Sequence, residues 1–160
     1  MKNIKDCENL NKKKVLLRLD LNVPLKNGII TDETRIKKIL PIIEYLLNKN
    51  AQIIIISHIG RPKGKINKAL SLKPICENLE KKINKKIQIV IEDIFNLNKE
   101  DLFKDPKTQI VFLENIRFYE HEEKNDISFA KKLANLGDLF VNDAFSCSHR
   151  AHASVSKITE

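Results

Sequence analysis

The sequence has few of the residues that would place it in several common classes of protein. Its three cysteines are odd in number and lack metal-ligand spacing, so neither a disulfide framework nor a zinc site is indicated. Its four glycines form no glycine-rich phosphate loop. No apolar run approaches membrane-spanning length, and the chain starts without an apolar signal segment. With thiols expected to be reduced, we predict a cytoplasmic protein.

Arginine is also scarce, and its positions are informative. Only five of the 29 basic residues are arginine, whereas lysine is scattered along the chain and gives most of the net charge of +8. Arg61, Arg117 and Arg150 each follow an apolar run that reads as a buried strand. Open α/β sheets bind ligands just beyond the carboxyl ends of their strands. Because a planar guanidinium grips carboxylate or phosphate bidentately, these positions indicate a small polyanionic ligand.

The length of 160 residues suits one domain with a substantial core. Strand-like and helix-like segments alternate, with buried strands predicted at 15–19, 53–57, 87–91, 110–113 and 138–141, and helices at 32–48, 71–84, 97–103 and 127–136. Alternation of this kind is typical of a doubly wound, Rossmann-like α/β/α fold, with a mostly parallel sheet and helices on both faces.

The first candidate motif is Asp20-Leu21-Asn22, which follows the strand predicted at 15–19 and precedes Pro24. At a strand end, Asp20 and Asn22 would point the same way and could bond a ligand hydroxyl or carboxylate. A turn with an Asx cap is the simpler alternative.

The second motif runs from Ser57 to Lys65 and contains His58, Gly60 and Arg61. It is not a P-loop, because the glycine spacing is too short and Pro62 removes an N–H that a phosphate cradle needs. A minor-groove hook for DNA is disfavoured, since an isoleucine strand feeds directly into the motif. A plain turn with a surface arginine remains the alternative.

Three other segments carry chemistry-bearing residues. Arg35 lies in the first turn of the helix at 32–48, where a cation is unfavourable, so it needs an anionic partner from a ligand or from Asp32 and Glu33. The stretch around Glu122 has no metal-ligand spacing; we predict a solvated acidic segment and no metal site. Cys147 lies close to His149, Arg150 and His152, but no base or orienting carboxylate can be assigned to it, so a free thiol is the better interpretation.

Taken in order, the motifs R-x-D-x-N-x-P, D-x-x-R-I, S-H-I-G-R-P, L-E-N-I-R-F and V-N-D-A-F…H-R-A-H-A-S resemble the amino-terminal half of phosphoglycerate kinase. The resemblance extends from about Val15 to Ser154. It implies that residues 1–160 form a single substrate-binding domain, truncated before the carboxy-terminal domain that binds nucleotide. It also implies a monomeric glycolytic kinase, a transferase that moves phosphate reversibly between ATP and the carboxylate of 3-phosphoglycerate to give 1,3-bisphosphoglycerate.

The resemblance also assigns roles to particular residues. Asp20 and Asn22 would take the hydroxyl and carboxylate end of the glycerate. A cradle around the substrate would be formed by Arg35, His58, Gly60, Arg61, Arg117 and Arg150. Arg35 would in addition be catalytic, stabilising charge on the transferring phosphoryl group. Arg18, His149 and His152 match a wider basic patch of the family.

Mg-ATP or Mg-ADP is the implied cofactor, but no nucleotide-binding residues can be named in this chain, which we expect to be inactive alone. The expected partners are 3-phosphoglycerate, 1,3-bisphosphoglycerate and the nucleotide domain, without nucleic acid or membrane. The chain departs from the family at Ser146, where a glycine is usual, so the following loop is expected to take a different path. The alternative function is a non-catalytic basic module that binds anions or nucleic acid.

Overall fold

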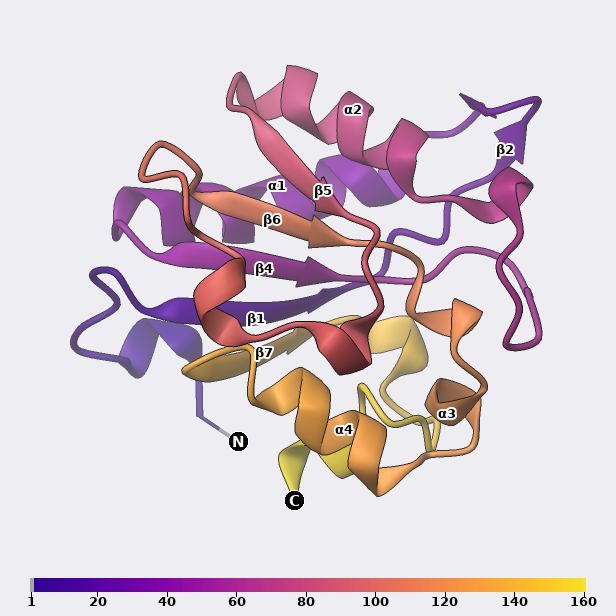
Figure 1. Cartoon of the computed structure of the whole chain (residues 1–160). Helices are drawn as coiled ribbons and strands as arrows, with labels where there is room; N and C mark the ends of the chain where they lie inside the picture. The colour runs from indigo at the N-terminus through magenta and orange to yellow at the C-terminus, as the bar shows by residue number, and fades with distance from the viewer. Residues whose placement is uncertain (1) are drawn as a thin grey trace.

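A five-stranded sheet forms the centre of the protein, seen in a computed structural model that describes residues 2–160. All of its neighbouring strands pair in parallel, in the order β5-β6-β4-β1-β7. The strands are β1 (Lys14–Leu19), β4 (Gln52–Ile56), β5 (Ile87–Val90), β6 (Ile110–Leu113) and β7 (Leu139–Asp143). Figure 1 shows the arrowheads of the sheet pointing the same way, so the carboxyl ends of the strands share one edge.

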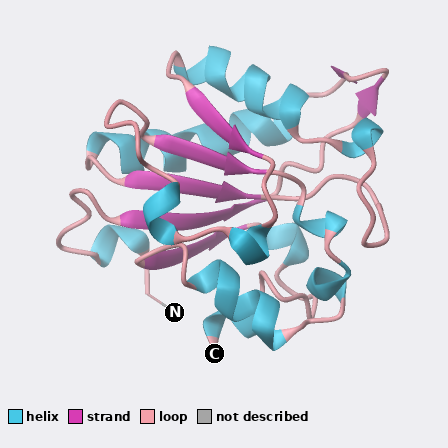
Figure 2. Ribbon diagram, viewed as in Figure 1, coloured by secondary structure: helices cyan, strands magenta, loops and turns pink. Residues whose placement is uncertain are grey.

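Helices cover both faces of this sheet, as predicted (Figures 1 and 2). Helices α1 (Thr34–Asn48) and α2 (Lys73–Ile83) pack on one face, and α4 (Ile127–Ala134) packs on the other. Helix α1 connects β1 to β4, and α2 connects β4 to β5, so this part of the chain moves from β1 toward one edge of the sheet. Helix α4 connects β6 to β7 in the opposite direction, because β7 lies on the other side of β1. This change of direction puts helices on opposite faces, because parallel crossovers are right-handed.

The core follows from the apolar runs of the strands. Ile53 to Ile56 of β4 are all fully buried, alternately beneath the helices of one face and of the other. A strand covered on both faces loses the alternation of apolar and polar residues. Each such side chain contributes roughly 1.5–3 kcal/mol by leaving water, so β4 anchors the loop that follows it.

Some local structure differs from the sequence prediction. The helix predicted at 97–103 is replaced by two 3-10 turns, Ile94–Asn96 and Lys99–Asp101, which Asp93 and Asn98 initiate as caps. A short antiparallel hairpin of β2 (Leu25–Lys26) and β3 (Ile29–Ile30), and the one-turn helix α3 (Glu120–Glu123), were not predicted. These elements are too short to show a hydrophobic period.

The described part of the chain, residues 2–160, contains no helix that is both long and apolar enough to span a membrane.

Candidate functional site

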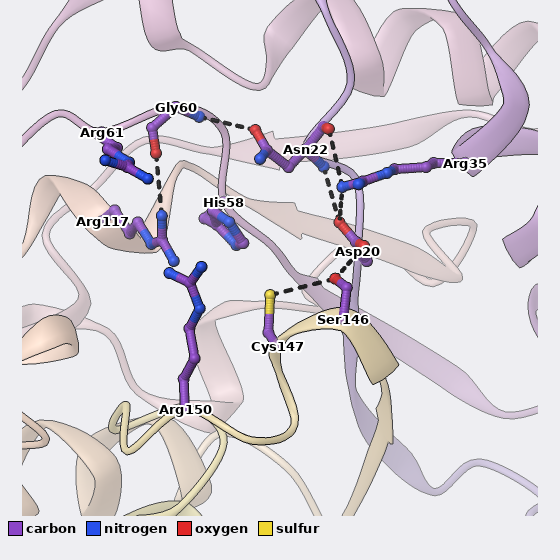
Figure 3. A pocket seen from close by; sticks show the side chains of 10 residues that line it. All are labelled: Asp20, Asn22, Arg35, His58, Gly60, Arg61, Arg117, Ser146, Cys147 and Arg150. Carbon is purple, nitrogen blue, oxygen red and sulfur yellow. Dashed lines mark hydrogen bonds and ion pairs between the residues drawn. The ribbon is translucent and has the colours of Figure 1, made fainter.

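A pocket of about 240 Å³ is lined by residues that follow the carboxyl ends of β1, β4, β6 and β7 and by Arg35 of α1. Figure 3 shows the side chains around it. Its lining brings together the eight residues predicted to bind substrate, from five separate segments: Asp20, Asn22, Arg35, His58, Gly60, Arg61, Arg117 and Arg150. The convergence follows from the fold, because the loops after parallel strands leave the sheet at the same edge.

Asp20 and Asn22 lie directly after β1 and are held in place by the protein itself. Arg35, at the start of α1, donates from Nη1 to Asp20 Oδ1 at 2.7 Å and to the carbonyl oxygen of Asn22 at 3.1 Å. The partner of Arg35 is therefore Asp20, not the neighbouring acids considered from the sequence. Asp32 instead accepts from Thr34, and Glu33 accepts from Lys82.

The loop after β4 contributes His58, Gly60 and Arg61. Gly60 has a φ of +63°, and a Cβ there would lie 2.7 Å from Leu70 Cδ2, so glycine is favoured at this turn. Its N–H donates to Asn22 Oδ1 at 3.0 Å, and its carbonyl accepts from Arg117 Nη1 at 3.2 Å. This one residue therefore joins the loops after three strands, β1, β4 and β6.

Arg117 is the most buried of the guanidinium groups that line the pocket. It is 4% exposed, and among residues 2–160 neither its Nε nor its Nη2 has a hydrogen-bond partner. Burial, with the charge of Arg150 adding to it, lowers the pKa of Arg117, although Glu123 opposes this. Figure 3 shows the side chains of Arg117 and Arg150 directed toward each other. Unpaired donors on neighbouring like charges are the arrangement an anion would complete.

The charges of the lining residues are strongly unbalanced. Four guanidinium groups line the pocket, against the single carboxylate of Asp20, which Arg35 already neutralises. His58 adds no charge, because burial, and then the charges of Arg18 and Arg117, lower its pKa to about 2. The lining therefore carries an excess of about three positive charges, which matches the charge of a molecule with one carboxylate and one phosphate.

The three residues of the predicted wider basic patch do not line the pocket. Arg18 is fully buried in β1, behind His58. His149 is exposed on the loop after β7, and His152 is half-buried. Burial, followed by the charge of Arg117, lowers the pKa of His152. The sequence motifs indicated that these three residues lie near the pocket, but they could not distinguish residues that line it from residues packed behind the lining.

Two further lining residues, Ser146 and Cys147, were not among the predicted site residues. The Ser146 hydroxyl donates to Asp20 Oδ2, and Cys147 Sγ lies 3.6 Å from that hydroxyl. The signal for Ser146 was present in the sequence as the departure from the family glycine. Its side chain fills space that a glycine would leave open and ties the loop after β7 to the loop after β1.

The interpretation of the acidic stretch as fully solvated is wrong for Glu122. Its side chain is completely buried, and it accepts from the Ser154 N–H at 2.9 Å as well as from the Ser154 hydroxyl. Glu120 and Glu123 are exposed or half-exposed, as expected. Nothing in three nearly adjacent acidic residues indicates which one a one-turn helix will turn inward.

The depressed pKa of His58 predicts a specific loss of stability in acid. Below an ordinary pKa near 6.5 the unfolded chain binds a proton on this ring, whereas the folded protein does not until about pH 2. The contribution of neutral His58 to the free energy of unfolding is therefore complete above about pH 6.5. It declines as pH falls, by up to about 1.4 kcal/mol per pH unit.

We expect the free energy of unfolding of the wild type to fall by about 2–3 kcal/mol more than that of His58→Gln between about pH 7.5 and pH 4.5. Urea denaturation at a series of pH values measures the difference. Parallel curves for the two proteins would contradict a neutral His58.

The geometry defines a class of protein: an α/β domain with a parallel sheet and an arginine-lined pocket at the carboxyl edge of its strands. Comparison with known proteins gives the family. The phosphoglycerate kinase family matches residues 4–160. Phosphoglycerate kinase of Wolbachia sp. subsp. Drosophila simulans (strain wRi) is 51% identical over 157 residues, which cover 98% of this chain and 39% of that protein. Phosphoglycerate kinase of Borrelia garinii subsp. bavariensis is 46% identical over 160 residues, covering 100% of this chain and 41% of that protein.

Solved structures agree with the sequence comparison. Phosphoglycerate kinase from Coxiella burnetii superposes with a TM-score of 0.86 at 38% identity, over 97% of this chain and 38% of that one. The enzyme from Pyrococcus horikoshii OT3 gives a TM-score of 0.84 at 32% identity, over 99% of this chain and 40% of that one. The chain belongs to the phosphoglycerate kinase family, and it spans about two fifths of the length of the curated relatives it matches.

Proposed function

We propose that this chain supplies the 3-phosphoglycerate site of a phosphoglycerate kinase. The whole enzyme would transfer phosphate reversibly between ATP and the substrate carboxylate, giving 1,3-bisphosphoglycerate, as a cytoplasmic, monomeric enzyme of glycolysis. The observation that carries the proposal is the pocket itself, in which four guanidinium groups converge with Asp20 and Asn22. Both the charge and the hydrogen-bonding groups suit a hydroxylated carboxylate that also bears a phosphate.

Within this proposal the residues have distinct roles. Asp20 and the side chain of Asn22 bind the hydroxyl and carboxylate end of the glycerate. The guanidinium groups of Arg61, Arg117 and Arg150 bind charged oxygens. Arg35 is catalytic: its guanidinium is partly exposed and oriented by Asp20, so it stabilises charge on the phosphoryl group during transfer.

The residues present do not suit the Mg-nucleotide that the family implies. Among residues 2–160, no three His, Cys, Asp or Glu side chains are grouped to hold a metal ion, and the pocket carries excess positive charge that would repel Mg²⁺. We assign the nucleotide and its metal to a part of the protein outside these 160 residues.

Titration calorimetry tests the substrate assignment. We expect the 160-residue chain to bind 3-phosphoglycerate weakly, and Arg61→Ala to weaken binding because it removes one charged partner of the ligand. Lys65→Ala is the matched control, since Lys65 is an exposed cation of the same loop that does not line the pocket. Equal heats from wild type and Arg61→Ala would count against the proposal. Salt-sensitive binding of duplex DNA without any heat from 3-phosphoglycerate would favour the nucleic-acid alternative instead.

The division of roles between the two halves makes a second test possible. Mixed with Mg-ATP and 3-phosphoglycerate in an assay coupled to ADP formation, the 160-residue chain is expected to show no turnover above buffer. ATP-dependent turnover that Arg35→Ala abolishes would refute the assignment of nucleotide binding to another part of the protein.

A further inference from the structure

Arg18 differs from the other four arginines because it cannot reach a ligand. It is fully buried within β1 and does not line the pocket. All three of its nitrogen atoms have partners: Nε donates to Ser154 Oγ at 3.0 Å, Nη1 donates to the Leu19 carbonyl, and Nη2 contacts His58 Nδ1 at 2.8 Å. Its function must therefore act through its neighbours.

The contact with His58 decides where the proton of that imidazole lies. A guanidinium has donors and no acceptor, so Nδ1 of His58 must accept and carries no hydrogen. The remaining proton of a neutral ring is then on Nε2. Because Arg18 occupies Nδ1 and His58 lines the pocket, Nε2 is the ring nitrogen left for a ligand.

Two buried residues hold Arg18 from its other side. The Ser154 hydroxyl accepts from Arg18 Nε and donates to Glu122, so the three groups form a directed chain of hydrogen bonds. Ser154, Glu122 and Arg18 all have an exposed fraction of 0%. Burial raises the pKa of Glu122, while the hydrogen bond from the Ser154 hydroxyl and the charge of Arg18 oppose this. The carboxylate in turn supports the charge of the buried guanidinium of Arg18.

We propose that Arg18 is a positioning residue that fixes His58 as its neutral Nε2–H tautomer, and that Ser154 and Glu122 hold Arg18 in the required orientation. This inference rests on the proposed function, in which the pocket binds 3-phosphoglycerate. His58 Nε2–H is then a directional donor for a ligand oxygen. It adds no positive charge to a pocket lining that already contains four arginines. A charged histidine at that position would increase repulsion among the cations of the site.

Nitrogen NMR of the free, ¹⁵N-labelled 160-residue chain tests the tautomer directly, with His58→Gln used to assign the signal. At neutral pH the expected spectrum shows a protonated Nε2 and an unprotonated Nδ1 for His58. A hydrogen on Nδ1, or a fully protonated ring, would overturn the proposal. In Arg18→Met the ring is expected to lose this fixed state, giving a mixture of tautomers and a raised pKa; an unchanged ring would also overturn it.

A double-mutant cycle then tests whether Arg18 acts through His58. Arg18→Met and His58→Gln are each expected to weaken 3-phosphoglycerate binding about tenfold, the effect of one hydrogen bond. The double variant should be no weaker than His58→Gln alone, whereas multiplied losses would mean independent roles. If Arg18→Met does not fold, Arg18→Lys takes its place, because it keeps the positive charge opposite Glu122 and removes the fork. Failure of the wild type to bind 3-phosphoglycerate would refute the proposed function, while the tautomer in the free protein would still decide the link between Arg18 and His58.

Discussion

Replacing Arg117 with alanine is expected to weaken 3-phosphoglycerate binding by about 2–4 kcal/mol, or roughly 30-fold to 1,000-fold in Kd. The size of the effect follows from burial. Arg117 is 4% exposed, so water replaces its contacts with an anion poorly once the side chain is removed. Its Nη2 atom has no hydrogen-bond partner among residues 2–160, and its Nε has only a long ion pair with Glu123 Oε1 at 3.9 Å, so both donors can turn to a ligand.

The same substitution should leave the stability of the free protein almost unchanged. Arg117 donates to the Gly60 carbonyl at 3.2 Å and lies 3.9 Å from Glu123 Oε1, contacts that together are worth about 2–3 kcal/mol. Against that loss, the variant no longer buries a guanidinium whose pKa is lowered by burial and by the neighbouring charge of Arg150. The two effects oppose each other, so the expected net change in the free energy of unfolding is small.

Calorimetric titration and urea denaturation of the same samples separate the two effects. Lys86→Ala removes one positive charge before β5, at the end of the sheet away from the pocket, and controls for net charge. Arg117→Lys should bind with intermediate affinity, because it keeps the charge and loses the bidentate geometry. Wild-type affinity in Arg117→Ala, or a loss no greater than that of Lys86→Ala, would exclude Arg117 from the site.

The sequence was sufficient to locate the pocket because two regularities act together. Continuous apolar runs such as Ile53 to Ile56 predict buried strands. When these strands are parallel, the residues that follow each strand lie at the same edge of the sheet. Residues far apart in the chain, including Arg61 and Arg150, could therefore be placed together without knowing the order of the strands. Asp20 and Asn22 lie on the same edge for the same reason.

What lies behind the pocket was not predictable in this way. Arg18 is in a strand buried on both faces, where no alternation indicates which way a side chain points. The register sets Arg18 beside Ile56 and Asn142, which determines its direction, but the register comes from the sheet and not from the local sequence. The burial of Glu122 depends in turn on the position of Ser154, 32 residues later. The orientation of Arg18 and the burial of Glu122 therefore depend on tertiary contacts, which no local sequence pattern indicates.

The buried chain that joins Glu122, Ser154 and Arg18 leads to the largest expected effect on stability. Glu122→Ala should destabilise the fold by about 3–5 kcal/mol, because it leaves the Arg18 charge buried without its counter-charge. It also removes the acceptor of the Ser154 N–H and hydroxyl. Glu122→Gln should cost somewhat less, about 2–4 kcal/mol: it also removes the counter-charge of Arg18, but an amide fills the same space and keeps one acceptor oxygen.

Urea denaturation of matched variants tests this account. Glu120→Ala is the control: Glu120 belongs to the same turn of α3, is exposed and pairs with Lys124 on the surface, so its removal should change stability by less than about 0.5 kcal/mol. The double variant Glu122→Ala/Arg18→Met should recover part of the stability lost in Glu122→Ala, because it removes both buried charges together. Equal stability of Glu122→Ala and Glu120→Ala would show that the buried carboxylate does not hold Arg18, and Arg18 would then have to keep its orientation through its bonds to Leu19 and His58 alone.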